Sequence, residues 1–229
     1  MTAVVIVAAG QGTRAETEVP KQYVELDRKT VLQRTIECFL ALEEISRVTV
    51  VISESDRHHY QTAVTKLMDP RLTEPVVGGN TRTQSVRAGL ASLASDPPQH
   101  VLIHDAARPF VSASAIKGVL DVLKIHDGAF VALPIVDAIW RTDGGFAISP
   151  MDRKVLWRAQ TPQGFQFNKI FEAHRNFSGD AADDVEVARA AGLLVKIVEG
   201  SEANFKITTP ADFSRAEVYL KHQGTAPNS

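Results

Sequence analysis

Short apolar runs alternate along this chain with longer segments in which apolar residues recur at helical spacing. Residues 3–9 form a continuous run of Ala, Val and Ile, which is typical of a strand buried on both faces. Residues 31–42 place Leu32, Ile36, Phe39 and Leu40 on one stripe of a helix. By the same criteria we expect strands at 48–52, 73–77, 101–104, 129–133 and 193–199, and helices at 56–67, 85–93, 112–124, 168–176, 183–191 and from 209 onward. This alternation predicts an α/β fold with a largely parallel sheet and helices on both faces.

The alternation is interrupted between Pro134 and Pro162. Two short runs, 138–142 and 146–149, flank Asp143-Gly144-Gly145, which is a β-hairpin signal. Because an isolated hairpin is only marginally stable in water, we expect an arm at about 135–155 that joins two copies of the chain in a homodimer. The alternative is a surface excursion that packs on its own chain. We expect one domain over residues 1–229, with a polar, flexible tail at 222–229.

Composition narrows the classes of protein to which the chain can belong. Of its 229 residues 44% are hydrophobic, which is enough to build a core, and 25 Lys and Arg against 27 Asp and Glu leave a net charge of -2. That balance argues against a nucleic-acid partner. A single cysteine, Cys38, excludes an internal disulfide, and the apolar run at the N-terminus is too short to span a bilayer. We therefore expect a soluble, cytoplasmic protein without a membrane partner.

A glycine-rich turn, A-A-G-Q-G-T-R at residues 8–14, directly follows the first predicted strand. In open α/β sheets, nucleotide phosphates bind at such turns, because glycine lets backbone N–H groups approach an anion. A P-loop is excluded by the absence of its Gly-Lys-Ser/Thr ending. A dinucleotide site fits superficially, since Gly10, Gly12 and Ala15 match G-x-G-x-x-A, but Pro20 disrupts the helix that should follow. An NAD-linked oxidoreductase therefore remains only a minor alternative.

A third interpretation of the turn uses two cations on the same loop. Arg14 and Lys21 lie beside the glycines, and together with free backbone amides they could hold a triphosphate without a P-loop. The alternative is a pair of solvated surface charges.

A second cluster, H-D-A-A-R-P at residues 104–109, follows the strand predicted at 101–104. Asp105 could bind Mg²⁺ together with phosphate oxygens, and Arg108 could bind an anionic group in a bidentate manner. The alternative is an Asp–Arg ion pair that closes a turn. Smaller groups with possible roles are Gly78-Gly79-Asn80-x-Arg82-x-x-Ser85, Asp152-Arg153, Gln160-Thr161-Pro162-Gln163 and the segment around Lys206.

Four of these segments, in order, resemble motifs of the 2-C-methyl-D-erythritol 4-phosphate cytidylyltransferase family. They are A-A-G-Q-G-T-R with the following P-K-Q-Y, then H-D-A-A-R-P-F, A-Q-T-P-Q-G-F and N-F-K-I-T-T-P-A-D-F. The resemblance implies a Rossmann-like, three-layer nucleotidyltransferase domain with a protruding β-arm. It also implies transfer of CMP from CTP to methylerythritol phosphate, with release of pyrophosphate, in non-mevalonate isoprenoid synthesis. Mg²⁺ is the implied cofactor and a homodimer the implied assembly.

The resemblance also assigns roles to individual residues. The nucleotide would be held by Ala8, Ala9, Gly10, Gly12, Gly79, Asn80, Ser85 and Asp105. Arg14, Lys21, Arg153 and Lys206 would be catalytic, with Arg153 reaching the substrate across the dimer interface. The sugar phosphate would lie near Asp105, Arg108, Arg153, Thr161 and Lys206, and Asp105 would be the metal ligand.

Two departures from the family pattern concern the polyol phosphate. Ala138 and Ala182 stand where the family often has threonine, and both lost hydroxyls lie near the sugar phosphate in the family. A cytidylyltransferase for another polyol phosphate, such as ribitol 5-phosphate, is therefore an alternative. A non-catalytic nucleotide-sensing domain is an alternative of a different class.

Overall fold

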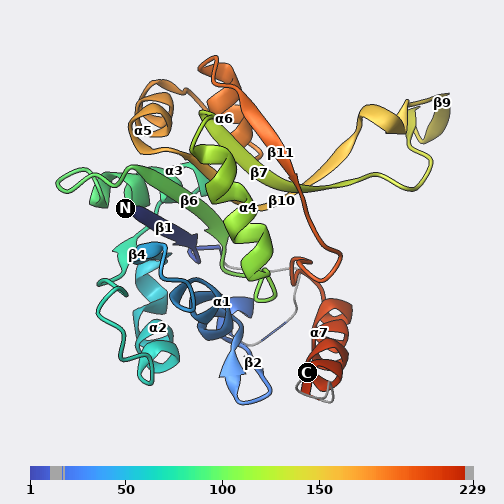
Figure 1. The fold of residues 1–229 in the computed structure, drawn as a ribbon. Coiled ribbons are helices and arrows are strands. Elements are labelled where there is room, and N and C mark those ends of the chain that lie inside the picture. Colours follow the sequence, from blue (N-terminus) through green and yellow to red (C-terminus); the bar gives the residue numbers. More distant parts are fainter. Residues whose placement is uncertain (11–16, 18, 225–229) are drawn as a thin grey trace.

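A computed structural model describes residues 1–10, 17 and 19–224, and its centre is a seven-stranded sheet (Figure 1). The strands follow the order β11-β7-β10-β6-β1-β4-β5. Strand β10 runs antiparallel to β6 and β7, whereas every other pairing in this sheet is parallel. The expected α/β fold with a mostly parallel sheet is therefore confirmed. The strands are β1 (Thr2–Val7), β4 (Ile45–Ile52), β5 (Val76–Val77), β6 (His100–Asp105), β7 (Gly128–Pro134), β10 (Trp157–Gln166) and β11 (Val195–Glu199).

Helices cover both faces of the sheet, so the body has three layers. Successive side chains of a strand point to opposite faces, and β1 accordingly contributes Val4 and Ile6 to one buried cluster and Ala3 and Val5 to another. The first cluster packs against α1 (Val31–Leu40), α2 (Arg57–Val64) and α4 (Ala113–Leu123). The second packs against α3 (Arg82–Ser92), α5 (Phe167–Asn176) and α6 (Asp184–Ala190).

A third, smaller cluster anchors the final helix, α7 (Pro210–Gly224). Phe205 and Ile207, from the segment just before α7, pack with Ala216 of that helix. The same cluster includes Leu26 of the small β2–β3 ribbon (Glu25–Leu26 and Lys29–Thr30) and Val31 of α1. The segment that carries Lys206 is thereby fixed against the body.

The predicted hairpin is present and leaves the body as an arm (Figure 1). Strands β8 (Trp140–Asp143) and β9 (Phe146–Pro150) form a separate antiparallel pair. Gly144 and Gly145 form the turn at φ values of 53° and 85°, which glycine adopts without steric cost. Apolar side chains of the arm stay in water, among them Phe146 at 76% and Trp140 at 52% exposure. The arm therefore does not bury these side chains on its own chain.

Three of the differences from the sequence-based expectations concern β10, α3 and α7. Strand β10 was not expected, because its central residues are Gln160-Thr161-Pro162-Gln163 rather than an apolar run. Helix α3 begins at Arg82 instead of residue 85, since the Thr81 side chain caps it by accepting from the Gln84 N–H. Helix α7 continues through Gly224, so the tail expected to be flexible from residue 222 is helical at its start, and residues 225–229 lie outside the described part.

Among the described residues, no helix is both long and apolar enough to cross a membrane.

Candidate active site

Four segments far apart in the sequence meet at the carboxyl ends of β1, β5 and β6. They enclose a cavity of about 250 Å³. Its lining includes nine of the residues proposed from the sequence: Ala8, Ala9, Gly10, Lys21, Gly79, Asn80, Ser85, Asp105 and Lys206. Gly12 and Arg14, proposed for the same site, lie outside the described residues. The carboxyl edge of a parallel sheet is where α/β proteins bind ligands, so this cavity has the expected place.

Hydrogen bonds connect the segment after β1, which lines the cavity, to the turn that carries Lys21. The buried Gln22 side chain donates from Nε2 to the carbonyl oxygens of Ala8, at 2.7 Å, and Gly10, at 3.1 Å. Lys21 and Gln22 begin the 3₁₀ turn η2 (Lys21–Tyr23), so these bonds hold the turn against the end of β1. Sequence analysis gave Gln22 no role, although its place next to Lys21 in P-K-Q-Y was a usable signal.

A tight glycine turn closes the opposite wall. A Cβ atom at Gly78 would lie 2.9 Å from the Ala9 Cβ and 2.6 Å from the Ser85 Oγ, so glycine permits the close approach of this turn to β1. The Ser85 hydroxyl donates to the Thr81 carbonyl at 3.0 Å, which commits its hydrogen to the turn. Gly79, Asn80 and Ser85 are therefore placed together, with the turn preorganised by its own hydrogen bonds.

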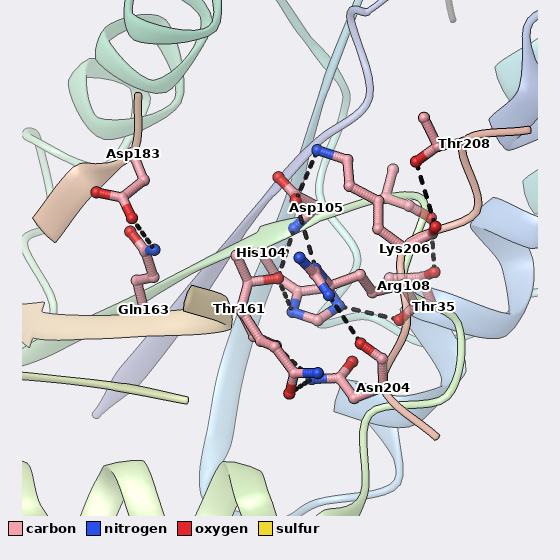
Figure 2. Close-up of polar contacts among 12 residues, drawn as sticks. Thr35, His104, Asp105, Arg108, Thr161, Gln163, Asp183, Asn204, Lys206 and Thr208 are labelled. Carbon is pink, nitrogen blue, oxygen red and sulfur yellow. Dashed lines mark hydrogen bonds and ion pairs between the residues drawn. The ribbon is translucent and has the colours of Figure 1, made fainter. Parts of the chain in front are cut away.

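Asp105 lies at the centre of the charged part of the site (Figure 2). Its carboxylate is 2.9 Å from Lys206 Nζ, 3.6 Å from Arg82 Nε and 3.5 Å from Arg108 Nε. Burial alone would raise the pKa of Asp105, but the positive charges of Lys206, Arg82 and Arg108 hold it well below its usual range. The Asp105–Arg108 ion pair anticipated as the alternative is thus present, as one contact in a larger network.

Arg82, which the sequence showed only as a member of the motif at residues 78–85, is central to the charged network. It connects Asp105 to a second buried carboxylate, Asp184, whose Oδ2 is 2.7 Å from Arg82 Nη2. The His174 Nε2 is 3.1 Å from the other oxygen of Asp184. Burial lowers the pKa of Arg82, but Asp184 and Asp105 outweigh burial and raise it, so the guanidinium remains charged. Asp184 is 102 positions away, which is why no local pattern revealed the pair.

A second cavity of about 240 Å³ adjoins the first and shares Arg82, Asp105 and Lys206 with it. Its further lining residues are Arg108, Ala159, Gln160, Thr161, Gln163, Ala182 and Asp183. Arg108 and Thr161, both proposed for a sugar phosphate, therefore line the same cavity. Ala182, one of the two departures from the family pattern, also lines this cavity, whereas Ala138 does not.

Arg153 lines neither of the two cavities of its own chain. It begins the 3₁₀ turn η4 (Arg153–Val155) beside the arm, is exposed, and donates from Nη1 to the Val136 carbonyl. Its proposed role depends on a second copy of the chain.

The side chains that line the cavity could bind Mg²⁺ only if phosphate oxygens of a ligand supplied further ligands to the metal. Within the described residues no group of three or more His, Cys, Asp or Glu side chains could hold a metal ion. Asp105 is the one carboxylate among the described lining residues of the first cavity, and it is ionised. Because Mg²⁺ commonly takes one or two carboxylates plus substrate phosphates, Asp105 suits a magnesium ion that is also bound by a triphosphate.

A cavity at the carboxyl edge of the sheet, lined by the backbone at Gly10 and Gly79 and by the cations Lys21, Arg82 and Lys206, is typical of an α/β nucleotide-binding protein. The sequence profile of 2-C-methyl-D-erythritol 4-phosphate cytidylyltransferase (IspD) matches residues 2–222, and the chain belongs to this family.

Relatives and solved structures agree with this assignment. A 2-C-methyl-D-erythritol 4-phosphate cytidylyltransferase of Cereibacter sphaeroides is 48% identical over 96% of both chains. A bifunctional enzyme IspD/IspF of Rhodobacter capsulatus is 46% identical, and the match covers 56% of its length. The crystal structure of 4-diphosphocytidyl-2C-methyl-D-erythritol synthase from Anaerococcus prevotii superposes with a TM-score of 0.84 at 26% identity, over 96% of both chains.

The Arg82–Asp184 pair predicts a large effect on stability. We expect Arg82→Met to lower the free energy of unfolding by about 3–5 kcal/mol, because it leaves the Asp184 carboxylate, 1% exposed, without its guanidinium partner. Arg82→Met with Asp184→Asn should regain part of this loss. Urea denaturation measures both effects.

Arg57→Met is the matched control, since Arg57 pairs with Glu54 at the surface and its loss should leave the urea midpoint essentially unchanged. Small shifts of equal size for Arg82→Met and Arg57→Met would contradict a structural role for the buried pair.

Proposed function

We propose that this protein transfers CMP from CTP to 2-C-methyl-D-erythritol 4-phosphate, releasing pyrophosphate and forming 4-diphosphocytidyl-2-C-methyl-D-erythritol. Membership of the family supports this reaction, and so does one structural observation: two adjoining cavities share the charged residues Arg82, Asp105 and Lys206. A transfer between two phosphate esters needs two anion sites that meet at common cations.

In this proposal CTP occupies the first cavity. The segment Ala8–Gly10 and the turn with Gly79, Asn80 and Ser85 hold the cytidine, and Asp105 lies near the ribose. Lys21 supplies positive charge to the triphosphate, together with Arg14 and the backbone at Gly12. The polyol phosphate occupies the second cavity, beside Asp105, Arg108, Thr161 and Lys206.

The chemistry requires no protein nucleophile and no general base. The attacking phosphate monoester already carries a charge of roughly -1.5 to -2 at neutral pH. Its obstacle is repulsion by the triphosphate, since one pair of unit charges about 4 Å apart costs about 4 kcal/mol at an effective dielectric constant of 20. Catalysis therefore consists of positioning and of cations placed between two polyanions. Lys206 lines both cavities and is suited to this task.

Asp105 would hold the Mg²⁺ ion, which would neutralise part of the charge on the triphosphate. The remaining positive charge comes from Lys21, Lys206 and Arg82 of this chain.

We further propose a cytoplasmic homodimer joined through the arm. The exposed apolar side chains of the arm, among them Phe146 beside the turn and Trp140 at the start of β8, are the kind of surface that a second copy covers. In such a dimer Arg153 would contact the polyol phosphate bound by the partner.

The proposed function is tested by incubating the protein with CTP, Mg²⁺ and a panel of polyol phosphates, followed by identification of the products. We expect pyrophosphate and 4-diphosphocytidyl-2-C-methyl-D-erythritol. Preference for ribitol 5-phosphate would show that the open space at Ala182 selects another polyol. CTP binding without pyrophosphate release from any acceptor would favour a nucleotide-sensing domain, and turnover of NAD would favour a dehydrogenase.

Lys21→Ala should lower kcat by about 100-fold or more while weakening CTP binding much less, because its charge is needed most as negative charge builds up in the transition state. The same separation is expected for Arg14→Ala. Steady-state kinetics gives kcat, and calorimetry gives the Kd for CTP. Lys117→Ala, which removes only a surface pair with Glu44, is the control. Weaker CTP binding with an unchanged kcat would show that Lys21 acts in ground-state binding alone.

Arg153 should act across the dimer. Mixed dimers of an Arg153→Ala chain and a Lys21→Ala chain contain one site that lacks neither residue, so we expect them to recover activity that each parent has lost. Pyrophosphate release by purified mixed dimers measures this recovery. Absence of activity in dimers verified to contain one chain of each kind would place Arg153 in the site of its own chain.

A further inference from the structure

His104 is a buried residue at the end of β6 to which the proposed mechanism gives no role. Its side chain is fully buried, and the Phe39 ring packs edge-on against it with a centroid distance of 4.9 Å. Both ring nitrogens have partners (Figure 2): Nε2 is 3.1 Å from the Arg108 carbonyl oxygen, and Nδ1 is 2.9 Å from the Thr161 Oγ1.

The partners determine which ring nitrogen carries the hydrogen. A carbonyl oxygen can only accept, so Nε2 donates to Arg108. Thr161 is buried, and of the two described partners of its Oγ1 the Asp105 N–H can only donate, so Nδ1 of His104 is the partner that accepts the hydroxyl hydrogen. The Thr161 hydroxyl therefore donates to His104, while its oxygen accepts the Asp105 N–H at 3.1 Å. The result is one directed chain of hydrogen bonds from Asp105 through Thr161 and His104 to Arg108.

This series of hydrogen bonds stabilises the turn at residues 105–108, which carries both Asp105 and Arg108. The Arg108 N–H closes the turn by donating to the Asp105 carbonyl at 3.0 Å. The Thr35 hydroxyl of α1 donates to the Ala106 carbonyl at 2.8 Å, and the Ile207 N–H donates to the Ala107 carbonyl at 2.9 Å. Thr161 adds a hydrogen bond at the Asp105 end of the turn, and His104 adds one at the Arg108 end.

We propose that His104 and Thr161 act together as positioning residues, which hold Asp105 and Arg108 in the geometry needed for cytidylyl transfer. In this geometry Thr161 gives its one hydroxyl hydrogen to His104, which leaves none for the phosphate of the polyol. This differs from the direct contact with the sugar phosphate that the resemblance implies for Thr161. The inference rests on the proposed function for its kinetic test, but not for its structural test.

The kinetic test uses Thr161→Val, Thr161→Ser and His104→Gln. Valine has the shape of threonine without the hydroxyl, and serine keeps the hydroxyl. Glutamine can place its amide N–H at the Arg108 carbonyl but then has no acceptor at the position of the His104 Nδ1. We expect Thr161→Val and His104→Gln each to lower kcat about 10- to 100-fold, with less than about threefold change in either KM. Thr161→Ser should recover most of the kcat that Thr161→Val loses, because it restores the hydroxyl.

The double variant His104→Gln/Thr161→Val should be no slower than the slower single variant, because both changes break the same chain. Multiplied losses would overturn the proposal. So would a Thr161→Val variant with a raised KM for the polyol phosphate and an unchanged kcat, which is the result expected for direct contact. Circular dichroism and thermal melts identify variants that fail to fold.

A structural test on the wild type and Thr161→Ser does not depend on activity. Nitrogen-15 NMR of the histidine rings should show His104 as the neutral tautomer with hydrogen on Nε2, in both proteins. A ring with hydrogen on Nδ1, or a protonated ring at pH 7, would overturn the inference. If the wild type transfers CMP to no polyol phosphate, the proposed function fails, and the NMR result still decides whether the chain of hydrogen bonds exists.

Discussion

Asp105 carries a negative charge that has been removed from water at the carboxyl edge of the sheet. An isolated buried carboxylate would be protonated, and this one remains ionised because Lys206, Arg82 and Arg108 surround it. The dependence is mutual, since three cations within 4 Å of one group would repel one another without it. The carboxylate thus lets positive charge gather from three segments of the chain, at the point where two cavities meet.

Holding those cations in place takes much of the remaining structure. Phe205 and Ile207 pack into the third buried cluster, while Lys206 between them reaches Asp105. On the side of α3, the buried Asp184 holds Arg82 in place. The Asn204 side chain donates to the Thr161 carbonyl at 2.8 Å and so joins the segment before α7 to β10. Packing therefore acts on the reaction indirectly, by fixing the backbone from which each charged side chain projects.

The sequence predicts those parts of the site that follow from local pattern. The apolar runs of β1 and β6 were visible, and with them the places where Ala8–Gly10 and Asp105 would lie. Strand β10 could not be predicted in this way, because it passes through the centre of the sheet with polar residues that bond to the site instead of an apolar run. The partner of Arg82 was hidden by a separation of 102 residues. The tautomer of His104 depends on a carbonyl and a hydroxyl that only folding brings to the ring.

Because the two cavities share lining residues, the binding energy of those residues can contribute to the rate of the reaction and not only to the affinity for the ligands. A cation that touched only one ligand would stabilise the bound state and the transition state about equally, which improves binding without speeding the chemical step. Lys206 and Arg82 line both cavities, so in the proposed reaction their interactions would strengthen as the two phosphates approach each other. Before any ligand binds, part of their charge is balanced by Asp105 and Asp184, which keeps the free site stable. The same carboxylates thus limit ground-state attraction and leave the largest gain to the moment when both anions are close.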